Sequence, residues 1–204
     1  MTRIVVASLF LLNHLLAVPV NASQTPTNNP NQLVKSAFET MQKLSSYKAY
    51  ADLAVGNRRA RIEAEVGIGK VAISMLGFDG KRSRNIITNQ EFFLSTDEGK
   101  TWKKDTEKYG LLRYNLISGV LEPSIKLHQQ GEWKVIGKET IEAVETLHLR
   151  LFAPSLIDIW VAEDAALGSY VRRVHVIVEG NDGELDNTVT YFDLNQPVNI
   201  VVPK

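Results

Sequence analysis

The strict alternation of polar and apolar residues from Arg59 to Val66 constrains the fold of this chain more than any other feature. Side chains of a β-strand point alternately to the two faces of its sheet. The charged residues of this run therefore face water, while Ala60, Ile62 and Ala64 face a core. Strands with one wet face are typical of antiparallel sheets, because strands of buried parallel sheets are apolar throughout. The run therefore predicts an antiparallel sheet with one solvated face.

Similar extended segments occur on both sides of this run, separated by turn signals such as Asp79-Gly80. Ahead of them, apolar residues recur at helical spacing from Leu33 to Leu44. Residues 108–121 interrupt the strand pattern with a leucine-rich stretch that predicts a short helical insertion. The sequence therefore predicts an α+β fold, mainly antiparallel β, with about ten strands. A sheet of that size curls, and its concave face is the one large surface on which the helices can bury their apolar sides.

The N-terminus has the pattern of an export signal. Arg3 supplies a positive charge, residues 4–20 are mostly apolar, and Val20-Asn21-Ala22 offers a small-residue cleavage site. The alternative is an uncleaved membrane anchor, although the apolar stretch is slightly short for a span and contains Asn13-His14. We expect a signal peptide over 1–22, cleaved after Ala22, a polar linker over 23–31 and one folded domain over 32–204.

Composition excludes several classes of function. The 204 residues have a formal net charge of zero, so the chain lacks the basic excess of a nucleic-acid-binding protein. The chain has no cysteine, which excludes disulfides, a thiol nucleophile, a thiolate metal site and lipidation after the signal. After signal cleavage we therefore expect a soluble periplasmic, cell-envelope or secreted protein, and not a lipoprotein.

The stretch Ser95 to Trp102, STDEGKTW, matches the Asp-box pattern S-x-D-x-G-x-T-W of sialidases and other β-propellers. In such a box the aspartate caps a hairpin turn, the glycine takes a positive φ and the tryptophan packs beneath. A glycosidase would also need paired carboxyl groups and, in a propeller, several repeats, and neither is visible. We interpret Asp97, Gly99 and Trp102 as structural residues of a hairpin.

The remaining polar residues show no enzyme pattern. His148 and His175 lie in extended segments and point away from the apolar face, so we interpret them as solvated or rim residues and not as metal ligands. Glu139, Glu142 and Glu145 fit a solvated hairpin turn. No nucleophile elbow, P-loop, zinc-protease or dinucleotide motif occurs. The sequence therefore predicts no catalytic residues, no cofactor and no metal.

Three segments together resemble the LolA-like superfamily of periplasmic lipoprotein carriers and LppX/LprG-type lipid-binding proteins. They are residues 33–55, the hairpin at 91–103 and the C-terminal part, with EAVETLHL at 142–149, IDIWV at 157–161 and YFDLNQPVNI at 191–200. The chain departs from the family pattern at Ala143, where glycine is usual, and in lacking the lipidation cysteine. The missing cysteine puts the membrane-anchored mode of the LppX-like members in doubt.

The resemblance implies an incomplete (half) β-barrel wrapped around the helices, with an apolar cavity for acyl chains. It implies a non-catalytic, monomeric carrier or sensor that binds a lipid or acylated ligand and makes transient contact with a membrane or an envelope protein. One alternative is a cell-envelope protein-interaction module with the same fold and a filled core. A less favoured alternative is an exported hydrolase.

The candidate cavity residues are apolar residues of the expected inner face and of the helical insertion, which would act as a lid. Each of them could equally be ordinary core, because pockets and cores share their composition. They are Leu53, Ile62, Ile73, Met75, Leu111, Leu112, Leu116, Ile117, Leu147, Leu149, Leu151, Ile159, Val174 and Val176.

Overall fold

The structure is a computed structural model that describes residues 29–89, 91–106, 131–152, 156–180 and 183–203. The predicted signal peptide and the helical insertion at 108–121 lie outside the described residues. The elements are α1 (Pro30–Gln42), β1 (Tyr47–Val55), β2 (Arg58–Gly67), β3 (Lys70–Leu76), β4 (Arg82–Thr88), β5 (Phe92–Ser95), β6 (Lys103–Lys104), β7 (Lys134–Ile141), β8 (Val144–Leu151), β9 (Leu156–Asp164), β10 (Gly168–Gly180) and β11 (Gly183–Phe192).

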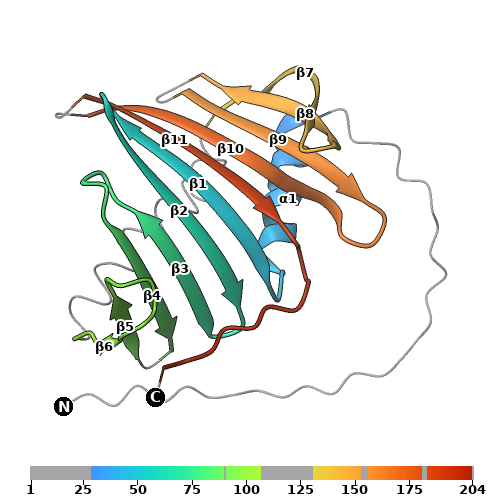
Figure 1. The fold of residues 1–204 in the computed structure, drawn as a ribbon. Coiled ribbons are helices and arrows are strands. Elements are labelled where there is room, and N and C mark those ends of the chain that lie inside the picture. The colour runs from blue at the N-terminus through green and yellow to red at the C-terminus, as the bar shows by residue number, and fades with distance from the viewer. Residues whose placement is uncertain (1–28, 90, 107–130, 153–155, 181–182, 204) are drawn as a thin grey trace, which may run out of the picture.

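All the strands belong to one 11-stranded antiparallel sheet in the order β6-β5-β4-β3-β2-β1-β11-β10-β9-β8-β7. Strands β1 to β6 form one meander and β7 to β11 another, each built from neighbours in sequence (Figure 1). The pairing of β1 with β11, from Lys48 opposite Phe192 to Val55 opposite Leu185, joins the two meanders. Because β6 and β7 are never paired with each other, the sheet is an open half-barrel, which confirms the predicted fold class.

Helix α1 lies against one face of the sheet, where it packs on β10 and β9 (Figure 1). We call this the inner face and the opposite one the outer face. The helix begins at Pro30, two residues before the predicted domain boundary, because the Asn29 side chain accepts a hydrogen bond from the N–H of Asn31. Its apolar side buries Val34, Ala37 and Phe38 against the sheet.

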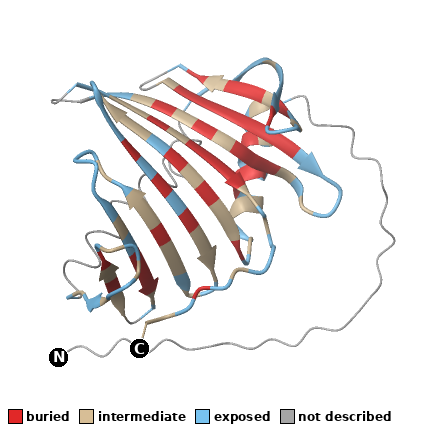
Figure 2. Cartoon of the chain, in the orientation of Figure 1, coloured by how far each residue is buried: buried red, intermediate tan, exposed pale blue. Residues whose placement is uncertain are grey.

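The alternation predicted for β2 is confirmed. Ala60, Ile62 and Ala64 are buried on the inner face, and Arg59, Arg61 and Glu63 are exposed on the outer face (Figure 2). Buried inner-face residues of β1–β4 and β8–β11 join α1 in one continuous hydrophobic cluster, the main core. Burial of the inner face therefore holds the sheet register in place, since a one-residue slip would turn these side chains toward water.

A second, smaller core lies on the outer face over β4 and β5. Here the C-terminal residues after β11 run back across the ends of the strands (Figure 1), and Val198, Ile200 and Val202 pack against Ile86 and Phe93. We call residues 194–203 the C-terminal strap. It is fastened at its start by the hydrogen bond from the Ser46 hydroxyl to the carbonyl of Gln196. The strap thus covers apolar outer-face residues that would otherwise be exposed.

Gly67 provides a test of this packing. A Cβ atom at this position would lie 2.8 Å from Cγ2 of Val198, whereas one at Gly137 would meet nothing within 4 Å. We expect Gly67→Ala to lower the free energy of unfolding by about 1–2 kcal/mol through overpacking, measured by urea denaturation. Gly137→Ala is the matched control and should leave stability nearly unchanged. The second change Val198→Ala should recover part of the Gly67→Ala loss; if it does not, the strap contact is not the cause.

Candidate functional site

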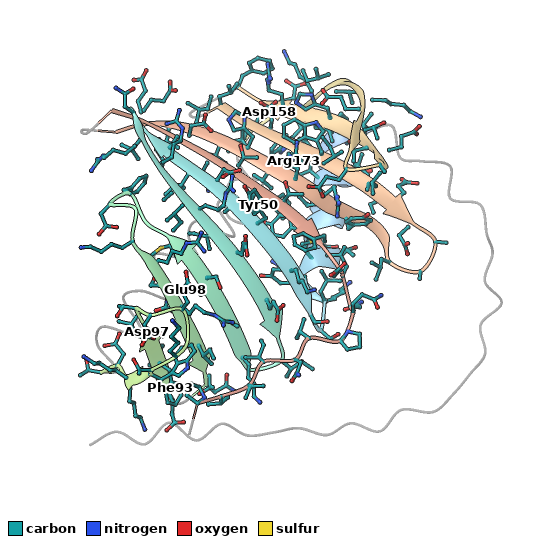
Figure 3. The ribbon with its side chains drawn as sticks, in the orientation of Figure 1. Tyr50, Phe93, Asp97, Glu98, Asp158 and Arg173 are labelled. Atoms are coloured by element: carbon teal, nitrogen blue, oxygen red, sulfur yellow. The ribbon has the colours of Figure 1, made fainter. Side chains whose placement is uncertain are left out.

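The Asp-box hairpin is built as the sequence predicted. The Asp97 carboxylate accepts hydrogen bonds from the Ser95 hydroxyl at 2.7 Å and from the N–H and hydroxyl of Thr101 at 2.9 and 2.6 Å. The Trp102 indole donates to the carbonyl of Gly99, which has a φ of 93°. The bonds from Thr101, followed by that from Ser95, hold the pKa of Asp97 well below its ordinary value. Asp97 is therefore a capping residue of the hairpin (Figure 3).

The main candidate site is a hollow of about 420 Å³ between the C-terminal half of α1 and the inner face of the sheet. Such a volume is within the range of small-ligand sites. The hollow is mostly apolar, and we call it the helix hollow. Its lining residues are Phe38, Met41, Gln42, Leu44, Tyr47, Val66, Val171 and Tyr191.

Local structure explains how these side chains meet. Phe38 and Met41 follow each other on the apolar side of α1, and Phe38 is only 4% exposed. Tyr47 opens β1, and its ring packs edge-on against that of Tyr191 at 5.9 Å. Val66 is directly opposite Tyr47 in the register of β1 and β2. The open end of the β1–β2 hairpin, where Tyr47 pairs with Val66, and the C-terminal end of the helix therefore face one another across the hollow.

The ten predicted cavity residues that lie in strands all share the inner face, as the strand registers show. Seven of them are buried in the main core: Ile62, Ile73, Leu149, Leu151, Ile159, Val174 and Val176. Met75 and Leu147 pack against that core, and Leu53 is half-buried. The predicted lid residues Leu111, Leu112, Leu116 and Ile117 lie outside the described residues.

The helix hollow is lined by residues that the sequence analysis did not select. Met75 is the one predicted residue that borders a hollow described here, a second one of about 400 Å³ near the turn between β3 and β4. That hollow is ringed by polar side chains, among them Asp79, Lys81 and Glu98. The helical apolar spacing of Phe38, Met41 and Leu44 was visible in the sequence and would have identified the helix side of the first hollow. The strand side of the helix hollow could not be identified in this way, because it depends on pairing between strands that are far apart in the sequence.

A group of hydrogen-bonded and ion-paired side chains crosses the outer face of β7 to β10. Figure 3 labels Asp158 and Arg173 in this region. We call it the outer polar cluster, and it consists of Glu139, His148, Arg150, Asp158, Trp160 and His175. The expectation that His148 and His175 point away from the apolar face is confirmed, but the expectation that His148 is solvated is wrong. His148 is only 5% exposed, because Trp160 stacks on its ring at 4.5 Å and two carboxylates enclose it.

Electrostatics keep the two carboxyl groups of this cluster ionised. Burial alone would raise the pKa of Asp158, but hydrogen bonds from Arg150 and His148 outweigh burial and lower it. The hydrogen bond from the Trp160 indole lowers the pKa of Glu139 against the effect of burial, and that from His148 adds to it. Within the described residues, no group of three or more histidine and acidic side chains is arranged to hold a metal ion.

Acid should weaken the fold through Asp158. Its pKa is lowered in the folded chain, so its contribution to stability is present above the unfolded pKa of about 4 and is lost as the pH falls through the lower folded value. We expect Asp158→Asn to cost about 2–3 kcal/mol of unfolding free energy near neutral pH, measured by urea denaturation. The difference from the unaltered chain should shrink below about pH 4.

The exposed carboxylate Asp52, paired with Arg61 on the same face, supplies the control. Asp52→Asn should cost less than about 1 kcal/mol, as for surface ion pairs in general. Equal losses for the two variants, or a difference for Asp158→Asn that stays constant down to acid pH, would contradict this account of the outer polar cluster.

Comparison with known proteins identifies the fold. No family model matches the chain, and no curated protein sequence matches it either. Among solved structures, the Mycobacterium tuberculosis lipoprotein LppX superposes with a TM-score of 0.60 over 84% of this chain and 97% of LppX, at 11% identity. LprF from Mycobacterium bovis superposes with a TM-score of 0.59 over 85% of this chain and 96% of LprF, at 10% identity. The chain therefore has the open half-barrel fold of LppX and LprF.

Proposed function

We propose that this protein is an exported, non-catalytic carrier or sensor that holds the acyl chain of a lipid or lipid-modified molecule in the helix hollow. The observation that carries the proposal is the hollow itself, an apolar space of about 420 Å³ between α1 and the sheet. Each methylene moved from water into such a space contributes about 0.8 kcal/mol, so an acyl chain can be held without a specific polar contact.

Two further observations support the proposal. The fold is shared with LppX, which is described as a lipoprotein. The aspartate of the Asp-box motif is occupied by hydrogen bonds within its own hairpin, so it is not available as a catalytic acid. No helix in the described part of the chain is long and apolar enough to cross a membrane. Export would follow from the N-terminal signal that the sequence predicts.

A protein-interaction module of the cell envelope is the second candidate. The observation that favours it is the close packing of the inner face, where seven predicted cavity residues are buried in the main core. In that case the helix hollow would be a packing imperfection at the end of α1, and no acyl chain would enter it. The two candidates therefore differ in whether the hollow takes up a ligand.

Filling the hollow tests the proposal. Val66 is half-buried at the end of β2 and lines the hollow, so the side chain of Val66→Trp would occupy space that a ligand needs. Displacing about two methylenes of a bound chain should cost about 1.6 kcal/mol, which weakens binding of a fluorescent fatty acid by about tenfold or more. Binding is measured by fluorescence titration, with circular dichroism to confirm that the variant is folded.

The matched control is Val178→Trp, the same substitution at an exposed position near the end of β10. It should leave the affinity for the fatty acid unchanged. Equal binding by a folded Val66→Trp variant would place the ligand elsewhere. Failure of the unaltered chain to bind the probe would favour the interaction module.

A further inference from the structure

His148 occupies an unusual position on the outer face. Its Nδ1 atom lies 2.7 Å from Oε1 of Glu139 on β7, and its Nε2 atom lies 2.6 Å from Oδ1 of Asp158 on β9. An ionised carboxylate only accepts hydrogen bonds, whereas a neutral imidazole has one donor and one acceptor. Both contacts are hydrogen bonds only when the ring is protonated at both nitrogens. In that doubly protonated form the ring would bridge the strands β7 and β9.

The two carboxylates are held to different degrees. Asp158 is 2% exposed and accepts two hydrogen bonds from Arg150, at 2.6 and 3.0 Å, so it stays in place when His148 changes. The side chain of Glu139 is 45% exposed, and its other partner is the Trp160 indole at 2.9 Å. When the ring loses a proton, its remaining N–H can stay on Asp158. The bare nitrogen then faces Glu139, which can turn toward water.

Glu139 belongs to an edge strand of the sheet. Strand β7 is an edge of the sheet and, in the described part of the chain, pairs only with β8. A bulge between Val135 and Gly137 interrupts even that pairing. Just before β7, Trp133 is buried in the main core. Its backbone N–H donates a hydrogen bond to the side-chain oxygen of Asn31 at the start of α1. Release of β7 would therefore loosen the packing of Trp133 in the main core and its hydrogen bond to the start of α1.

The other charged groups around His148 do not replace this contact. Arg150 on β8 is bound to Asp158, and Arg173 on β10 lies over the Trp160 ring. His175 on β10 has its Nδ1 3.7 Å from Asp158 and its Nε2 3.0 Å from Asp186 on β11. Glu139 is thus the one carboxylate that ties β7 to this cluster, and His148 is its charged partner.

We propose that His148 is a protonation-dependent clasp, which fastens the edge strand β7 to the sheet when it carries its second proton and releases β7 when it loses that proton. The clasp is independent of the proposed ligand. It makes the order of one edge of the half-barrel depend on the protonation of this ring.

Amide hydrogen exchange tests the clasp directly. Protection factors, corrected for the intrinsic pH dependence of exchange, are measured for residues 134–141 and for β10 between about pH 5 and pH 9, while NMR follows the His148 ring. We expect protection of β7 to fall about tenfold or more as His148 loses its proton, because two charge-assisted hydrogen bonds become one. Protection of β10 should not change at that step.

Two variants separate the clasp from a general effect of pH. In Glu139→Gln the side-chain amide can donate to or accept from either form of the ring, so the step in β7 protection should disappear while β7 stays protected. In His175→Gln the step should remain. The proposal is overturned if protection of β7 is constant through the titration of His148, if His148 does not titrate in this range, or if Glu139→Gln retains the step.

Discussion

The pairing of β1 with β11 is the contact on which the rest of the structure depends. Each meander is a set of hairpins between neighbours in sequence, and the main core contains buried residues of both. Eight paired residues, from Lys48 opposite Phe192 to Val55 opposite Leu185, join the two meanders into one curved surface. This junction sets Tyr47 of β1 beside Tyr191 of β11 and so builds the helix hollow. It also brings the start of the C-terminal strap to Ser46, just ahead of β1.

Local features of this fold could be predicted from the sequence because their causes are local. The alternation in Arg59–Val66 specifies which side chains face the core, and STDEGKTW specifies a capped hairpin whatever surrounds it. The β1–β11 pairing could not be predicted in this way, because the sequence of neither strand specifies which strand, more than a hundred residues away, it pairs with. For the same reason the predicted cavity residues share the correct face, yet the helix hollow lies at one end of it. The burial of His148 was missed because alternation indicates a face and not how neighbouring long side chains cover that face.

The two faces of the sheet divide the chemistry of the molecule. The inner face is apolar, holds α1 and carries the hollow in which we propose that an acyl chain is bound. The outer face carries the small core beneath the C-terminal strap over β4 and β5. Over β7 to β10 it carries the outer polar cluster, in which we propose that protonated His148 fastens the edge strand β7. The hollow and the outer polar cluster meet at α1, which is tied to the residues before β7 through Asn31 and borders the hollow at its other end. Any ordering of β7 would thus be transmitted to the helix that forms one wall of the proposed site.

The central claim, that the interior of the half-barrel holds an acyl chain, is tested most directly by native mass spectrometry of the protein purified without detergent. The account predicts a stoichiometric adduct that is released on denaturation and identified as a fatty-acyl species in a solvent extract. It also predicts that Val66→Trp carries less of that adduct than Val178→Trp. A clean mass for the bare chain, together with no uptake of an added fatty acid, would contradict the claim and favour an interaction module with a filled interior.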